Sequence, residues 1–173
     1  MSFQPVVPLS GYTGWRFLTR TLDSQREAFN ESATIQRATD QFREKIGQIG
    51  SAADLVNDRQ LLEVALGAFG LNDDINNRYF IQRILGDGVS DPEALANRLS
   101  DSRYKDFAKA FGFGEGIPPR TQLSFFADEI IDRYEARQFE RAVGEQDNTM
   151  RLALNLAPAL SDIVAGNGSD TAR

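Results

Sequence analysis

A dense alternation of helix-ending and helix-starting residues in the stretch 54–113 most constrains what this chain can fold into. Apolar residues there recur at steps of three and four, which is typical of helices with one buried face. Gly70 follows the stripe that ends at Phe69, at the position of a left-handed C-terminal cap. Gly112 follows Phe111 in the same way. The pattern predicts a series of short helices joined by tight turns.

Polar residues mark the expected starts of these helices. Ser90 and Glu93 have the spacing of a capping box. Asp101 or Ser102 is expected to cap the last helix of the stretch, and residues 72–74 are expected to cap the second. Each start therefore has a side chain that accepts hydrogen bonds from free backbone N–H groups.

Two apolar stripes upstream of this stretch predict an antiparallel helical hairpin. The first stripe spans 15–29 and the second spans 35–49, and the sequence Asn-Glu-Ser at 30–32 suits the turn between them. Residues 1–9 contain two prolines, so we expect an extended arm that lies on the domain or on a partner.

The downstream part begins with the strongest loop signal of the chain, the glycines and prolines at 112–119, where we expect a hinge. A long helix follows and is interrupted at 144–147. A last apolar stripe continues beyond the interruption. Pro158 lies inside this stripe and predicts that the helix kinks or stops near Ala157.

The fold class follows from the same periodicity. No segment shows the alternation of a strand, and β-branched residues are few, so the chain is expected to be all-α. We predict a single compact multi-helix domain of about six to eight helices over 10–165, which begins with the hairpin and ends with a long helix. The arm, 1–9, precedes this domain, and a flexible tail, 166–173, follows it.

Composition excludes several classes of function. The net charge of -6 disfavours nucleic acid and anionic membrane surfaces as partners. The chain has no cysteine and no histidine, which excludes thiolate nucleophiles, Ser-His-Asp triads and the usual zinc and haem sites. No apolar run has the roughly 20 residues that span a bilayer, and no secretory signal is recognisable at the N-terminus. The default localisation is cytoplasmic.

Residue clusters that resemble binding motifs have simpler explanations. Asp73 and Asp74 lack the spacing of a calcium loop, and helix capping is the preferred interpretation. Gly112, Gly114 and Gly116 follow a predicted helix rather than a strand, so they do not form a dinucleotide-binding fingerprint. We therefore predict no catalytic residues, no metal site and no cofactor.

Two groups of residues are candidates for contacts with another protein. Trp15 and Phe17 belong to an aromatic cluster beside the proline-rich arm, and aromatic residues are favoured at interfaces. Core anchoring is the competing interpretation of this pair. Leu156, Leu160 and Ile163 form an apolar face that is left open near the end of the chain.

A resemblance to a known family is carried mostly by helix ends and apolar faces, over about 10–156. The matching residues are Asp54-Leu55-Val56, Asp58, Leu61-Leu62, Ala65, Ala68-Phe69-Gly70-Leu71, Leu95-Ala96-Asn97-Arg98-Leu99, Asp101, Arg103-Tyr104, Ala110-Phe111-Gly112-Phe113, Tyr134, Phe139-Glu140, Val143-Gly144-Glu145 and Met150-Arg151-Leu152-Ala153-Leu154. On these residues the chain resembles an uncharacterised bacterial family, mainly alphaproteobacterial, catalogued as a domain of unknown function. Genes of that family often lie among those for the flagellar basal body and rod.

This resemblance implies a helical protein with no established catalytic residues and an association with the flagellum. It also implies that the chain is a fragment of a longer protein, because longer relatives continue past the position of Arg173. We expect a non-enzymatic helical interaction or structural protein whose partner is another protein, such as a flagellar component.

The alternative is a small-molecule-binding helical domain or an enzyme that uses carboxylate and arginine side chains in a pocket between helices. Its candidate residues are Asp73, Asp74, Asp101, Arg103 and Tyr104. A pocket in which these side chains converge would favour this alternative.

Overall fold

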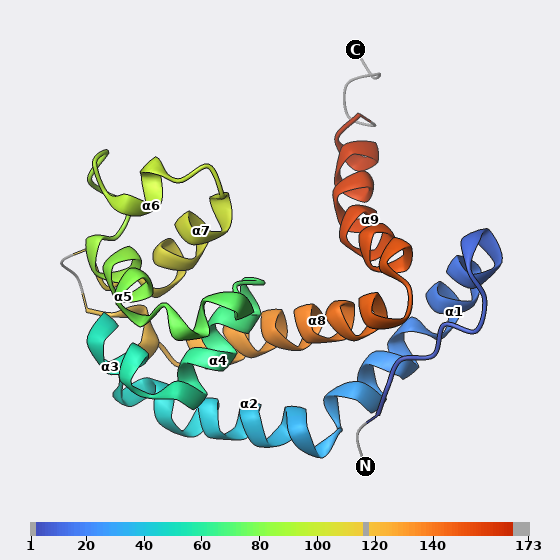
Figure 1. The fold of residues 1–173 in the computed structure, drawn as a ribbon, viewed down its shortest axis with the longest axis horizontal. Coiled ribbons are helices and arrows are strands. Elements are labelled where there is room, and N and C mark those ends of the chain that lie inside the picture. The colour runs from blue at the N-terminus through green and yellow to red at the C-terminus, as the bar shows by residue number, and fades with distance from the viewer. Residues whose placement is uncertain (1–2, 116–117, 168–173) are drawn as a thin grey trace. The chain divides into compact units, whose positions relative to one another are not determined.

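The computed structural model describes residues 3–115 and 118–167, and the side chains of 3–115 and 118–158 (Figure 1). Within these residues it contains nine α-helices, three short 3₁₀ helices and no strand. The α-helices are α1 (Gly11–Asn30), α2 (Ala33–Lys45), α3 (Ala52–Asn57), α4 (Arg59–Ala68), α5 (Arg78–Asp87), α6 (Leu95–Arg98), α7 (Ser102–Phe111), α8 (Phe126–Gln146) and α9 (Asn148–Asn167). The 3₁₀ helices are η1 (Ile46–Gln48), η2 (Asn72–Asn76) and η3 (Arg120–Gln122). The prediction of an all-α fold is confirmed.

Contacts within the chain divide it into two compact units. The first unit contains residues 1–32 and 138–173, and the second contains 33–137. The arm, α1, the C-terminal part of α8 and α9 thus belong to the first unit, and α2 to α7 belong to the second. The predicted turn between the first two helices is confirmed, since helical structure is interrupted only at Glu31 and Ser32. Their antiparallel pairing stays a prediction.

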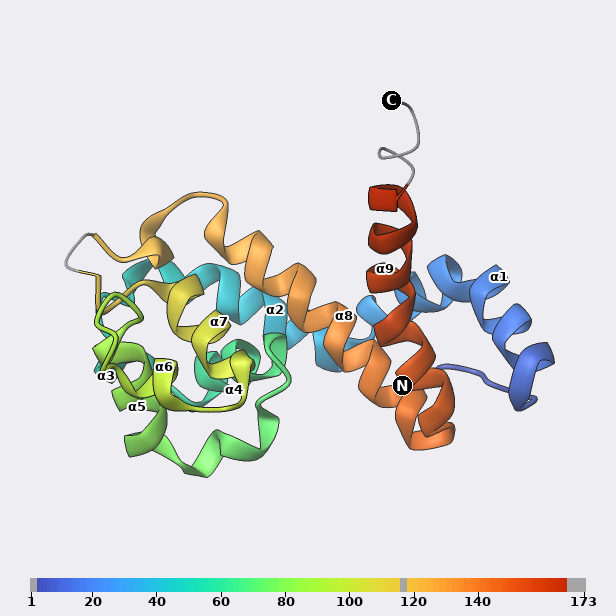
Figure 2. The same cartoon turned by 90° about the horizontal axis from the view of Figure 1, so that it is seen from above.

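The second unit is built from short helices that pack pairwise (Figures 1 and 2). In it α4 packs against α2 and α3, and α5 packs against α3, α6 and α7. A row of buried phenylalanines joins these pairs. Phe69 lies 5.3 Å from Phe107 between ring centroids, and Phe107 lies 5.2 Å from Phe111. Phe111 then lies 5.1 Å from Phe126 at the start of α8, so one aromatic row links α4, α7 and α8.

The predicted ends of α4 and α7 are confirmed. Gly70 has a φ of 70°, and its N–H donates to the carbonyl of Gly67 at 3.2 Å. The N–H of Leu71 donates to the carbonyl of Leu66 at 2.9 Å, which completes a Schellman motif. Gly112 ends α7 in the left-handed region with a φ of 67°.

The predicted capping box at Ser90 is wrong, because its hydroxyl is used in a tertiary contact. This hydroxyl donates to the carboxylate of Glu115, which also accepts the N–H of Val89 at 3.1 Å. α6 then begins only at Leu95 and is a single turn. The same contact holds the start of the predicted loop 112–119, whose role as a hinge stays a prediction.

Residues 72–74 do not cap α5 as predicted, because they form the start of η2. The residue before α5 is Asn77, whose side chain makes no capping hydrogen bond. Asp74 instead accepts a hydrogen bond from the side-chain amide of Asn77 at 2.7 Å. The predicted cap at Asp101 is confirmed, since its carboxylate accepts the N–H of Arg103 at 3.0 Å.

In the first unit, α8 ends at Gln146 and α9 begins at Asn148, which confirms the predicted interruption. Of the two outcomes predicted near Ala157, a stop is wrong, because α9 continues through Pro158 to Asn167. A kink at this point stays a prediction. Proline removes a single N–H from the helix, and the hydrogen bonds of the neighbouring turns are enough to carry the helix past it. The predicted tail lies outside the described residues from position 168 onward.

Candidate functional site

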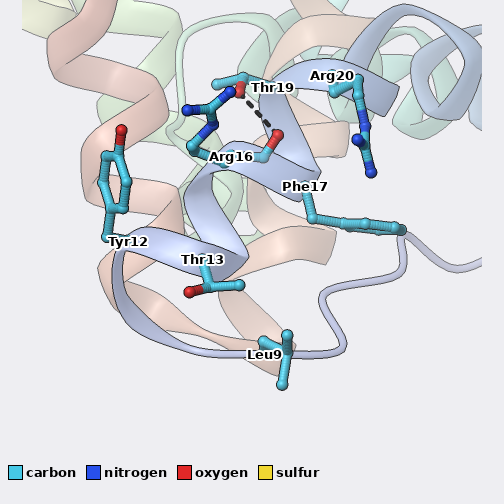
Figure 3. Close-up of a pocket in the computed structure, with 7 residues that line it drawn as sticks. All are labelled: Leu9, Tyr12, Thr13, Arg16, Phe17, Thr19 and Arg20. Carbon is cyan, nitrogen blue, oxygen red and sulfur yellow. Dashed lines mark hydrogen bonds between the residues drawn. The ribbon is translucent and has the colours of Figure 1, made fainter.

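A cavity of about 610 Å³ lies along α1 in the first unit (Figure 3). Its walls come from the N-terminal half of α1 and from the end of the arm. The lining residues are Leu9, Tyr12, Thr13, Arg16, Phe17, Thr19 and Arg20. All of them except half-buried Phe17 are exposed, so the cavity opens to solvent.

The sequence of α1 separates a buried side from the side that carries the cavity. Gly14, Leu18, Gln25 and Phe29 are buried. Successive residues of an α-helix are rotated by about 100°, so these four share one side of α1. The exposed cavity residues of α1 fall on the opposite side, and half-buried Phe17 lies between the two sides. Trp15 lies at the edge of the buried side and is half-buried.

The arm is held on the first unit by two glutamine side chains. The N–H of Val6 donates to Oε1 of Gln25 at 2.7 Å, and Nε2 of Gln25 donates to the carbonyl of Val6 at 3.1 Å. The N–H of Val7 donates to Oε1 of Gln146 at 3.3 Å, and Nε2 of Gln146 donates to the carbonyl of Pro5. These bonds satisfy backbone groups of a segment that has no strand or helix to pair with.

Gly14 allows the arm to turn tightly against α1. A Cβ atom at this position would lie 1.7 Å from the carbonyl oxygen of Leu9 and 3.0 Å from Cε of Met150. Only glycine fits so close an approach. Leu9, whose side chain is 54% exposed, is thereby presented at the rim of the cavity (Figure 3).

The cavity combines aromatic and basic side chains. Figure 3 shows Tyr12 and Arg16 on one flank of α1, and Phe17 and Arg20 on the other. Tyr12 is 73% exposed. None of the lining residues is acidic, and no ion pair among the described residues involves either arginine. Aromatic and arginine side chains together are typical of protein-binding surfaces.

The predicted interaction residues are distributed over two helices. Phe17 lines the cavity, whereas Trp15 does not. Leu156 is 58% exposed on α9, as expected for an open apolar face. The side chains of Leu160 and Ile163 lie outside the described residues.

Sequence reasoning missed Arg16, Arg20 and Leu9 as members of this surface. The available signal was the spacing of the two arginines, which places them on the side of α1 opposite the apolar stripe. Leu9 gave no signal, because its position depends on how the arm is anchored.

Four of the five residues of the alternative hypothesis, all except Asp73, meet in the second unit. Arg103 pairs with Asp101 through Nη2 and Oδ2 at 2.7 Å and through Nε and Oδ1 at 3.0 Å. Nη1 of Arg103 also donates to the carbonyl of Gly70 at 2.6 Å. The hydroxyl of Tyr104 donates to Oδ2 of Asp74 at 2.7 Å. Most of their polar atoms are therefore engaged in holding the end of α4, η2 and the start of α7 together.

The protonation states of this cluster fit a structural role. The hydrogen bonds from Arg103 lower the pKa of Asp101, and the same pair raises the pKa of Arg103. The hydrogen bond to Asp74, with added contributions from burial and charge, raises the pKa of Tyr104 to about 12. Tyr104 is therefore a hydrogen-bond donor at neutral pH and a poor general base. Asp73 is exposed and takes no part in these contacts.

Two further classes of site are not found in the described part of the chain. Its aspartates and glutamates form no group of three or more that could hold a metal ion. None of its helices has both the length and the apolar content needed to cross a bilayer.

The described residues define an all-α protein with an exposed aromatic and basic surface on its first helix. A family model described as "Protein of unknown function (DUF1217)" matches residues 68–167, and the chain belongs to this family. The resemblance to an uncharacterised family is thus confirmed. No curated protein matches the chain.

A solved structure supports this assignment. The crystal structure of a protein from Agrobacterium tumefaciens is similar to this chain with 31% sequence identity and a TM-score of 0.76. The match covers 88% of this chain and 69% of that chain. The description of that protein gives no activity.

Proposed function

We propose that this protein is non-enzymatic and acts by binding another protein, with the cavity surface of α1 as the contact. The observation that carries this proposal is the group of residues on that surface, in which half-buried Phe17 lies among the exposed residues Leu9, Tyr12, Arg16 and Arg20. They present apolar area and positive charge on the side of α1 that the first unit does not cover. Exposed aromatic residues beside arginines are the composition of binding hot spots.

The proposal that catalysis is absent has separate support. The side chains best suited to acid-base work are already engaged, since Tyr104 donates a hydrogen bond to Asp74 and Asp101 pairs with Arg103. They do not line the cavity on α1. The chain also lacks histidine and cysteine. We therefore assign the cluster to the stability of the second unit.

The proposed partner is a component of the flagellum. This part of the proposal rests on the family resemblance, in which genes of related proteins lie among those for the basal body and rod. The protein would then act in the cytoplasm or at the flagellar base.

A complementation assay tests both the flagellar partner and the use of the α1 surface. Deletion of the gene from its source organism should reduce swimming motility, and the wild-type gene should restore it. A Phe17→Asp variant, checked for correct folding by the fluorescence of Trp15, should fail to restore motility because a carboxylate disrupts the apolar part of the surface. A matched Phe125→Asp variant changes an exposed phenylalanine of the second unit and should restore motility.

Normal motility of the deletion strain contradicts the flagellar assignment. Equal rescue by both variants contradicts the use of the α1 surface. Crosslinking in cells followed by purification provides the partner's identity, and a partner that is retained by Phe17→Asp binds elsewhere on the protein.

A further inference from the structure

We infer that the α1 surface binds an acidic segment of its partner, whose carboxylates pair with Arg16 and Arg20 and whose apolar side chain packs against Phe17 and Leu9. This inference deepens the proposed function and rests on it. It names the chemistry of the segment that occupies the cavity.

The cavity carries positive charge that no acidic side chain of its lining offsets. Arg16 and Arg20 are one helical turn apart on α1 and both line the cavity. Ion pairs engage Arg43, Arg103 and Arg133 in the second unit, but no described residue forms an ion pair with either cavity arginine. A guanidinium has a rigid fork of donors that matches a carboxylate, so a carboxylate-bearing ligand is complementary to both positions.

The charge of the whole chain favours a short acidic segment over an extended polyanion. At physiological ionic strength, charges further apart than about 8 Å are largely screened, so a short segment interacts mainly with the two arginines. A nucleic acid or an anionic bilayer would extend past the cavity and meet a chain of net charge -6. The cavity volume of about 610 Å³ suits a few side chains of a peptide.

The arm supplies the apolar part of the site. Gln25 and Gln146 fix Val6 and Val7, and the tight approach to Gly14 then places Leu9 at the cavity rim. Because these anchors lie outside the cavity, they set the position of one wall without touching the ligand. An apolar side chain of the bound segment would be enclosed between this wall and Phe17.

A random peptide library displayed on phage provides a probe that requires no knowledge of the partner. The purified protein is used for selection beside an Arg16→Glu/Arg20→Glu variant. The control variant, Arg37→Glu/Arg78→Glu, has the same net charge but reverses exposed arginines of the second unit. We expect the wild type and the control to enrich peptides with several Asp or Glu residues next to a large apolar residue. The cavity variant should not enrich them.

Fluorescence anisotropy with an enriched peptide then measures how much the two arginines contribute to the binding affinity. The cavity variant should bind about tenfold more weakly than the control, and added sodium chloride should weaken wild-type binding. Enriched peptides that are neutral or basic, or equal binding by the two variants, overturn the inference and leave the proposed function standing. Stronger arginine-dependent binding to phosphatidylglycerol vesicles or to a single-stranded oligonucleotide overturns it too. A surface that enriches no peptide at all contradicts the proposed function itself.

Discussion

The side-chain amide of Gln25 pairs with the backbone of Val6 through two hydrogen bonds, as a neighbouring strand would. Oε1 accepts the N–H of Val6 at 2.7 Å, and Nε2 donates to its carbonyl at 3.1 Å. Nε2 also donates to the hydroxyl of Thr21 at 2.8 Å, which fixes the orientation of the amide. This buried side chain thus anchors the arm together with Gln146, and through the arm it helps to position Leu9 beside the cavity.

We expect Gln25→Ala to free the arm. The substitution removes both partners of Val6, so the amide hydrogen of Val6 should exchange with solvent markedly faster, as measured by hydrogen–deuterium exchange. Gln60→Ala is the control, because it removes an exposed amide from α4 in the second unit. Unchanged exchange at Val6 in Gln25→Ala would show that the amide does not hold the arm.

Gly14→Ala should destabilise the first unit. The new methyl group would lie 1.7 Å from the carbonyl oxygen of Leu9, so the arm must move away from α1 at a cost of about 1–3 kcal/mol. Thermal unfolding followed by the fluorescence of Trp15, the single tryptophan, measures this cost. In α5, Gly86→Ala meets no atom within 4 Å and should stabilise the protein by about 0.5–1 kcal/mol. Equal effects of the two substitutions would contradict the packing of the arm.

Asp74→Asn should lower the pKa of Tyr104 from about 12 toward about 10, because it weakens the hydrogen bond that the phenol donates and removes the negative charge beside it. Ultraviolet titration of the four tyrosines measures the change. Folding raises the pKa of Tyr104, so the protonated phenol stabilises the folded state. This contribution is complete below about pH 10 and is lost as the pH rises through about 12. A wild-type titration in which all four phenols ionise together near pH 10 would contradict the hydrogen bond.

Phe111→Ala should be the most damaging of the aromatic substitutions in the second unit. Phe111 is fully buried and contacts both Phe107 and Phe126, so we expect a loss of about 3–5 kcal/mol in the free energy of unfolding. Phe125 is 54% exposed, and its replacement by alanine should cost less than about 1 kcal/mol. Urea unfolding followed by circular dichroism compares the two variants. Similar costs would argue against the aromatic row as the core.

Local chemistry explains which helix boundaries were predictable. Gly70, Gly112 and Asp101 act on the backbone within a few residues of themselves, and each behaves as its type and position predict. Ser90 has equally favourable spacing, but its hydroxyl donates to Glu115, which lies 25 residues further along the chain. A rule based on the spacing of neighbouring residues cannot detect such a distant hydrogen-bond partner. Pro158 shows the reverse case, in which a helix tolerates a residue that usually ends it.

The candidate site was predictable in part for a similar reason. Phe17 was identified because it belongs to an aromatic cluster beside the proline-rich arm, and interfaces favour aromatic residues. Arg16 and Arg20 were not, because exposed arginines on helices are ordinary and only the cavity gives them a shared role. The anchoring of the arm by Gln25 and Gln146 depends on hydrogen bonds between distant residues, which hydrophobic periodicity does not report.

Site-specific photocrosslinking in cells tests the central claim most directly. A photoreactive phenylalanine analogue replaces either Tyr12 or Tyr79, which have nearly equal exposures of 73% and 79% but lie on α1 and α5. The account predicts a crosslink to one defined protein from position 12, lost when Arg16 and Arg20 are both changed to glutamate, and none to that protein from position 79. A crosslink to it from position 79 alone, or a position 12 crosslink that survives loss of both arginines, would contradict the account.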